Sequence, residues 1–309
     1  MPSGDIRPAS GDWRRAFAPL GVPTLIIADH PALLETALAA YADWVGEAPA
    51  AAPVIELRLG LGGASSGKVS DGIRIEGSRL ALADAGIDGR ADARTGRARC
   101  VVPPRLLDDP PAIAEAIDTL LLFLLARMGR PPLHAAGLML GDTALLLAGP
   151  SGSGKSTLAL AWAAEGLPVL SDDTVHLQLE PEFRIWSFAR PIHVFADEAP
   201  PGDHAIRVRS GKRKAAVRLP PASGARRSAD RAVLVVLDRA ARPALDPIDA
   251  EDAVAALMRL DPGFDLLPLE SARAIRAAAR GGAWRLALTG DPAAAIALLR
   301  TRPELTRSA

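Results

Sequence analysis

The front third of the chain alternates between helix-type and strand-type hydrophobic patterns. Apolar positions recur at helical spacing over residues 33–45, and shorter strand-type runs follow at 54–61, 72–75 and 79–83. Turns rich in glycine and serine separate these runs. This order predicts a small α+β module.

Prolines and a long helical pattern separate this module from the rest of the chain. Two proline pairs stand at 103–104 and 110–111, and residues 112–128 have the pattern of a long helix that Gly129 and two further prolines end. We therefore expect a domain boundary near residue 110. Residues 1–110 would form the small module, whose role the sequence does not indicate, and residues 111–309 a second domain.

The second part alternates strands and helices. Apolar runs at 138–140 and 143–148 flank Gly141-Asp142, a two-residue link typical of a tight hairpin. Further strands are predicted at 169–171, 175–179, 231–238 and 284–288, and helices at 158–164, 250–259, 271–280 and after Asp291-Pro292. The fold class is therefore α/β, with a mixed sheet that contains antiparallel as well as parallel strands.

Composition indicates a globular protein with material for two cores. The chain has 309 residues, of which 49% are hydrophobic and 23% charged, and its formal net charge is zero, which argues against a dedicated nucleic-acid binder. A single cysteine, Cys100, excludes an internal disulfide. The first twelve residues carry charges and a proline where a signal peptide needs an apolar core, and the longest apolar stretch, 120–126, is too short for a bilayer. We expect a cytoplasmic protein with no membrane partner.

The most informative motif is a glycine-rich octet of the form G-x-x-x-x-G-K-[ST]. It follows an apolar strand and precedes an Ala/Leu-rich helix, which is the context that a phosphate-binding loop (P-loop) requires. The octet reads Gly149, Pro150, Ser151, Gly152, Ser153, Gly154, Lys155, Ser156. We therefore expect a nucleoside triphosphate, ATP in the first instance, as a ligand.

Each residue type in the octet has a physical role. The glycines let backbone N–H groups turn inward, and the start of the following helix favours phosphate. Lys155 would reach the β- and γ-phosphates, and the Ser156 hydroxyl would be a ligand of Mg²⁺. Thr157 extends the nucleotide-binding set without a role of its own.

An acid pair, Asp172-Asp173, stands 17 residues after Lys155 (172 − 155). That distance is about one helix and one turn, which would return the pair to the phosphates at the end of the neighbouring strand. Phosphoryl transfer to a hydroxyl uses one carboxylate in the Mg²⁺ shell and another as a base. Adjacent strand residues point to opposite sides, so two different roles suit this pair better than a shared one. A solvated turn after a strand is the alternative.

His134 lies at the start of the strand that leads into the hairpin. A lone histidine beside an apolar strand is usually a structural, hydrogen-bonded residue. Its place ahead of the octet and the acid pair also makes it a candidate catalytic residue.

These three segments resemble the carboxy-terminal kinase domain of HPr kinase/phosphorylase, and more closely the HPr-kinase-related serine kinases found beside peptide-chaperone proteins. The matching strings are LHAAG at 133–137, AGPSGSGKS at 148–156 and LSDD at 170–173. The resemblance is specific over about residues 112–179 and implies a P-loop kinase core like that of phosphoenolpyruvate carboxykinase. It also implies roles: Asp172 in the Mg²⁺ shell, Asp173 as the base toward a serine hydroxyl, and His134 assisting near the transferred phosphate.

The resemblance further implies a protein or peptide acceptor, such as a ribosomally made peptide or a small carrier protein. The segment that the bifunctional enzymes use to remove phosphate is not found after the acid pair, which argues against phosphorylase activity. A homo-oligomer is compatible with the sequence.

Between residues 207 and 227 the chain has eight lysines and arginines and no acid. Lys212, Arg213 and Lys214 are candidates for stabilising transferred charge or receiving an acidic acceptor. A solvated basic loop is the alternative, and nucleic acid is not expected there because no aromatic residue could stack a base.

Two function classes follow from the sequence. The first is an ATP- and Mg²⁺-dependent kinase acting on a serine of a protein or peptide. The second is a nucleotide-regulated binding protein without a phosphorylated acceptor. A kinase of a small hydroxyl metabolite is a variant of the first class.

Overall fold

The computed structural model describes residues 11–44, 51–63, 72–188, 190–209, 212–219, 228–260 and 268–306. The chain divides into two compact units, Met1–Met128 and Gly129–Ala309, which we call the N-terminal and C-terminal units. Within these residues, no helix has the length and apolar character to cross a lipid bilayer.

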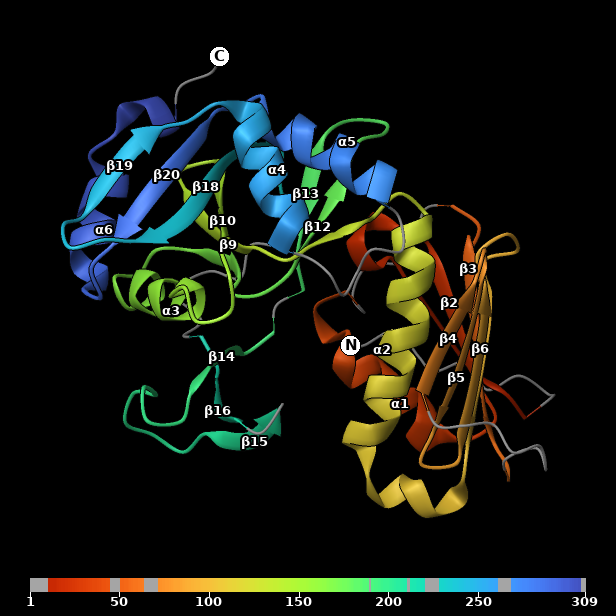
Figure 1. The fold of residues 1–309 in the computed structure, drawn as a ribbon. Coiled ribbons are helices and arrows are strands. Elements are labelled where there is room, and N and C mark those ends of the chain that lie inside the picture. Colours follow the sequence, from red (N-terminus) through yellow and green to blue (C-terminus); the bar gives the residue numbers. More distant parts are fainter. Residues whose placement is uncertain are drawn as a thin grey trace, which may run out of the picture. The chain divides into compact units, whose positions relative to one another are not determined.

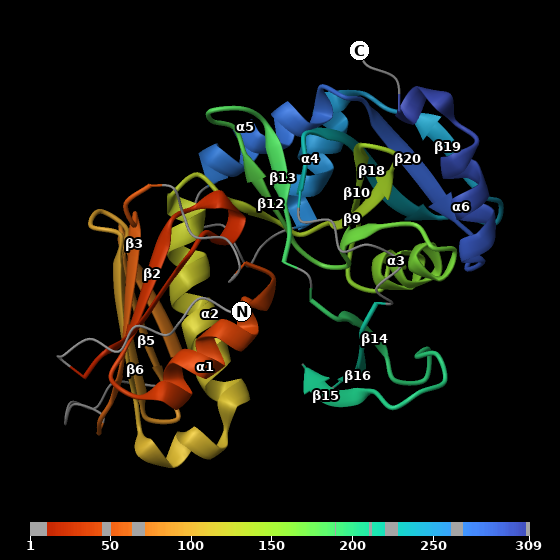
Figure 2. The same ribbon diagram turned by 180° about the vertical axis from the view of Figure 1, so that it is seen from behind.

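The N-terminal unit is a seven-stranded sheet with two helices on one face (Figures 1 and 2). The strand order is β1-β2-β3-β7-β6-β5-β4; β2, β3 and β7 run parallel, and the other pairs are antiparallel. The elements are β1 (Trp13–Phe17), β2 (Thr24–Ala28), α1 (Pro31–Ala40), β3 (Ile55–Leu61), β4 (Gly72–Glu76), β5 (Arg79–Asp84), β6 (Ile87–Asp92), β7 (Arg97–Val102) and α2 (Pro110–Arg127). Short 3-10 helices cover Pro19–Gly21, Ala42–Trp44 and Pro104–Asp108.

The predicted helix and three predicted strands of this module are confirmed, but four strands were missed. In β6 and β7 every second residue is buried against the helices, while the residues between them are mostly charged or polar. The helix predicted at 33–45 is α1, which begins earlier because the His30 side chain accepts a hydrogen bond from the Ala32 N–H and Pro31 opens the first turn.

The long helix predicted at 112–128 belongs to the N-terminal unit, so the division falls after Met128 rather than near residue 110. α2 packs on β5, β6 and β7 and beside α1. The Tyr41 hydroxyl donates a 2.6 Å hydrogen bond to Asp118 Oδ1 and joins α1 to α2. The proline pair at 110–111 therefore begins a helix of this unit, and does not separate two domains.

The single cysteine lies in the middle of this unit. Cys100 is in β7, is 0% exposed, and is a free thiol. Burial, with a smaller effect of the Asp88 charge, raises the pKa of the thiol to about 12.

The C-terminal unit is built on a six-stranded mixed sheet with helices on both faces. Its strand order is β11-β9-β10-β18-β20-β19; β10, β18 and β20 are parallel, and β9 and β19 are antiparallel to their neighbours. The strands are β9 (Ala136–Leu140), β10 (Thr143–Ala148), β11 (Val169–Ser171), β18 (Arg231–Arg239), β19 (Ala244–Pro247) and β20 (Ala283–Leu288). The predicted hairpin and the mixed α/β fold are confirmed.

Helices and two small sheets complete the unit. The helices are α3 (Lys155–Ala164), α4 (Ala250–Leu260), α5 (Pro268–Ala279) and α6 (Pro292–Arg300), with a 3-10 turn at Pro303–Leu305. One small sheet has the order β17-β13-β12-β8 and the other β14-β16-β15. Their strands are β8 (Pro132–Leu133), β12 (Val175–Gln178), β13 (Arg184–Trp186), β14 (Ile192–Phe195), β15 (Ala205–Arg209), β16 (Lys212–Val217) and β17 (Ser228–Ala229).

All six residues of β10 are buried. Leu145 and Leu147 belong to the core that includes Trp162 of α3, and Leu146 belongs to the opposite core, which includes Leu257 of α4. A strand buried on both faces has a continuous apolar sequence, which is why this run was predicted correctly.

The division after Met128 can be tested with two truncated chains. α2 buries Ile113, Ile117, Leu120, Leu121 and Leu124 at 0–1% exposure. At about 2 kcal/mol for each side chain, their burial contributes on the order of 10 kcal/mol, comparable with the whole stability of a small domain. A chain of residues 1–128 should unfold cooperatively in urea by circular dichroism, whereas residues 1–110 should show no cooperative transition. If the two chains unfolded with equal cooperativity, the domain boundary would lie near residue 110 and not after Met128.

Candidate functional site

The glycine-rich octet links β10 to α3, at the edge where three parallel strands end. β18 extends past the end of β10, and Leu237 on this extension lies beside the loop. A Cβ added to Gly149 would lie 3.1 Å from the Cβ of Leu237. Arg239, at the end of β18, donates a 2.9 Å hydrogen bond to the Gly152 carbonyl. Ligands of α/β sheets bind at the carboxyl ends of such strands.

The backbone of the loop requires its glycines. A Cβ at Gly149 would lie 2.7 Å from Ser153 Oγ, and Gly152 and Gly154 have φ of +82° and +104°. Gly154 precedes α3 and offers no side-chain cap, so the first N–H groups of that helix face the loop without one. The Ser153 hydroxyl is buried, and no described residue hydrogen-bonds to it. Such a set of donors suits a phosphate.

The loop encloses the ammonium group of Lys155, a residue that is 7% exposed. Lys155 Nζ donates to the carbonyls of Gly149 at 2.6 Å and Pro150 at 3.3 Å. Burial lowers the pKa of Lys155; the charges of Asp173 and Asp172 act to raise it, and that of Lys214 to lower it further. Both acids of the predicted pair therefore act electrostatically on the loop lysine.

Asp172 is the buried member of the acid pair, at 6% exposure. Burial and the charge of Asp173 raise its pKa to about 6, although the His193 N–H and the Ser156 hydroxyl donate hydrogen bonds to it and act in the opposite direction. The bond from His193 N to Asp172 Oδ2 is 2.9 Å. The two residues predicted to hold a metal, Ser156 and Asp172, are thus in contact.

The oxygens of Ser156 and Asp172 fit a magnesium ion better than an ion that needs a full protein cage. Among the described residues, no group of three or more His, Cys, Asp and Glu side chains could hold a metal. Mg²⁺ is commonly held by one or two protein oxygens together with phosphates and water.

Asp173 is the open member of the pair, with a side chain 58% exposed. Its Oδ1 lies 3.4 Å from His134 Nδ1, and its Oδ2 accepts a 3.3 Å hydrogen bond from the Thr174 hydroxyl. The pairing of β11 with β9 places Ser171 opposite Gly137, which brings the end of one strand beside the start of the other. The structure therefore brings His134 and Asp173 together.

Several contacts of the site were missed in the sequence. Arg239 donates a hydrogen bond to the loop, and the His193 N–H donates one to Asp172. Glu198 accepts a 3.3 Å hydrogen bond from Thr157. The position of Arg239 at the end of a strongly apolar strand was a usable signal. The residues before His193 and Glu198 have no sequence pattern that predicts where the chain runs, so their contacts with the site could not be foreseen.

The basic segment is only partly described. β15 and β16 form an antiparallel hairpin, and β16 pairs with β14. The charge of Lys214, in β16, acts to lower the pKa of Lys155. Residues 210–211 and 220–227, and the side chains of Arg207, Arg209 and Lys212, lie outside the described part.

Comparisons with known proteins find similarity among solved structures only. No protein-family model and no curated protein matches the chain. Among solved structures, the chain is similar to the Hpr(Ser) kinase/phosphatase from Coxiella burnetii, with a TM-score of 0.28, 14% identity, and coverage of 55% of this chain and 93% of that one. A similarity of this size identifies neither an activity nor a substrate.

The electrostatics of Asp172 predict a pH-dependent stability difference. Its pKa of about 6 in the folded chain is above the ordinary 3.8, so ionisation destabilises the fold as pH rises from about 4 to 7. The full cost, (6 − 3.8) × 1.36, is about 3 kcal/mol at most. Asp172→Asn does not titrate, and urea unfolding should show its stability relative to wild type rising across this pH range and staying constant above it. A difference independent of pH would mean that Asp172 has an ordinary pKa.

Proposed function

We propose that this protein is a Mg²⁺-dependent kinase with a P-loop core that transfers the γ-phosphoryl group of ATP to a serine hydroxyl of a protein or peptide. The observation that carries the proposal is the division of the acid pair. Asp172 is buried against Ser156, whereas Asp173 is exposed beside His134. Two adjacent carboxylates in such different environments suit two different chemical roles.

Residues 149–157 would hold the triphosphate. The N–H groups at the start of α3 and the unpartnered Ser153 hydroxyl would donate to phosphate oxygens. Lys155 would exchange its two carbonyl acceptors for the β- and γ-phosphates, which supply the negative charge that carbonyls lack.

Ser156 and Asp172 would hold the magnesium ion. When bound there, Mg²⁺ neutralises charge on the phosphate oxygens. Asp172 must be ionised to bind a cation, and its Ser156 and His193 contacts already favour the ionised form.

Asp173 would act as the base in the transfer step. The serine oxygen forms a bond to the γ-phosphorus while the bond from that phosphorus to the β–γ bridging oxygen breaks, and Asp173 accepts the hydroxyl proton as ADP leaves. His134, 3.4 Å away, would hold the carboxylate in position. The exposure of Asp173 supports an acceptor residue presented by another polypeptide.

The proposed roles of Lys155 in ATP binding and of Asp173 in phosphoryl transfer can be distinguished by experiment. Lys155→Ala should weaken binding of a fluorescent ATP analogue at least tenfold, because it removes a charge from the phosphates. Asp173→Asn should keep the ATP affinity within about threefold and lower transfer about 10²-fold or more, because it removes only the base. Transfer is measured with γ-labelled ATP and a peptide library with a central serine, beside the same library with central alanine.

Two outcomes would contradict the kinase proposal. Normal transfer by Asp173→Asn would remove the proposed base. Tight ATP binding with no peptide labelled would instead favour the nucleotide-regulated binding protein.

His134 can be tested by a variant of similar size whose polar atoms do not coincide with Nδ1, the atom that faces Asp173. His134→Gln should lower kcat about tenfold or more while KM for ATP stays unchanged, because only the orientation of Asp173 is affected. Urea unfolding serves as the control. An unchanged kcat, or a large loss of stability, would assign His134 a structural role.

A further inference from the structure

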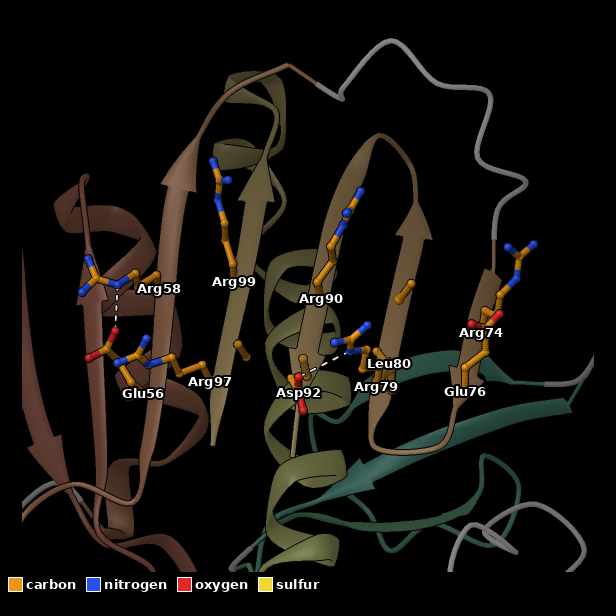
Figure 3. A pocket seen from close by; sticks show the side chains of 13 residues that line it. Glu56, Arg58, Arg74, Glu76, Arg79, Leu80, Arg90, Asp92, Arg97 and Arg99 are labelled. Carbon is orange, nitrogen blue, oxygen red and sulfur yellow. Dashed lines mark hydrogen bonds and ion pairs between the residues drawn. The ribbon is translucent and has the colours of Figure 1, made fainter. Parts of the chain in front are cut away.

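The sheet face of the N-terminal unit that the helices leave uncovered contains an arginine-rich trough. The trough has a volume of about 720 Å³, and side chains from β3, β7, β6, β5 and β4 line it (Figure 3). Its lining includes six arginines and three acids. The arrangement of these charges is more informative than their number.

Strand register sorts the charges into two rows that cross the strands. In the first, which we call the arginine row, Arg58 lies opposite Arg99, Arg99 opposite Arg90, and Arg74 follows after an alanine on β5. In the second, the balanced row, the signs alternate from strand to strand. Its members in order are Glu56, Arg97, Asp92, Arg79 and Glu76.

The two rows differ in how their charges are satisfied. In the balanced row each charge faces an opposite one, as in the 3.4 Å pair of Arg79 and Asp92. In the arginine row three like charges are direct cross-strand neighbours, which is unfavourable.

Acids compensate the arginine row only in part. Arg58 contacts Glu56 at 2.8 Å and Arg90 contacts Asp88 at 3.4 Å, both along their own strands. Arg99 and Arg74 are exposed and have no ion pair among the described residues. A row of solvent-facing guanidinium groups with too few acids is the electrostatic form of an anion-binding surface.

We propose that the arginine row binds an acidic, extended peptide segment of a partner protein. From Arg58 to Arg74 the row spans four strand spacings, about 19 Å, which is the length of about six extended residues. Each guanidinium can bind a carboxylate through two parallel hydrogen bonds. This surface lies wholly within the N-terminal unit and does not depend on the kinase proposal.

Two features favour a peptide over a nucleic acid. None of the described residues that line the trough is aromatic, so bases would have no stacking partner among them. The acids of the balanced row run beside the arginine row and can accept hydrogen bonds from the backbone N–H groups of a peptide, which a sugar-phosphate backbone lacks.

The test is fluorescence anisotropy with the full chain and a labelled octapeptide of alternating Glu and Ser, at 50 mM and 300 mM NaCl. We expect saturable binding that weakens with salt, and at least tenfold weaker binding of the matching Gln-Ser peptide. The variant Arg90→Gln/Arg99→Gln should lose at least tenfold in affinity. The control Arg94→Gln/Arg242→Gln removes the same charge from exposed positions outside the row and should change the affinity less than twofold.

Measuring the melting temperature of the row variant shows whether unfolding causes its loss of affinity. Arg90→Gln/Arg99→Gln removes like-charge repulsion and should melt at or above the wild-type temperature. Equal binding of the Glu and Gln peptides, or equal affinities of the two double variants, would overturn the proposal. Tighter binding of an eight-nucleotide oligothymidylate, lost in the same row variant, would overturn it in favour of nucleic acid.

Discussion

The candidate site depends on the burial of β10. Because both faces of this strand are packed against core residues, its carboxyl end is fixed, and the loop that follows has little freedom in where it starts. Neighbouring strands add to this constraint: β18 supplies Leu237 and Arg239, and a Cβ on Gly154 would lie 3.3 Å from Leu288 of β20. The loop is therefore held by the sheet and by the helix that it begins.

The same sheet arranges the charges. β9 pairs with β10 on one side and with β11 on the other, so residues beyond the end of β11 return to the loop. This arrangement has an energetic cost, because the carboxylate of Asp172 and the ammonium of Lys155 are both largely removed from water. Sites that bind charged ligands commonly have such a cost, because the ligand supplies the missing counter-charge.

The sequence predicted the parts of this site whose signals are local. The loop was recognisable because glycines, lysine and serine stand at fixed spacing between an apolar strand and a helix. The contact between His134 and Asp173 was not predictable from pattern, because it depends on the register of a three-residue strand against β9. The division between the units was misplaced because an apolar helix such as α2 has the same pattern whichever sheet it covers. The arginine row was likewise hidden, since it exists only through the pairing of five strands.

The one thiol of the chain lies in the core of the N-terminal unit, beneath the arginine row. Only the thiolate reacts readily with alkylating reagents, and the burial of Cys100 in the folded sheet disfavours both ionisation and access. Modification of Cys100 therefore has to wait for an opening of β7. The rate at which Cys100 is labelled therefore measures how often β7 opens within the N-terminal unit.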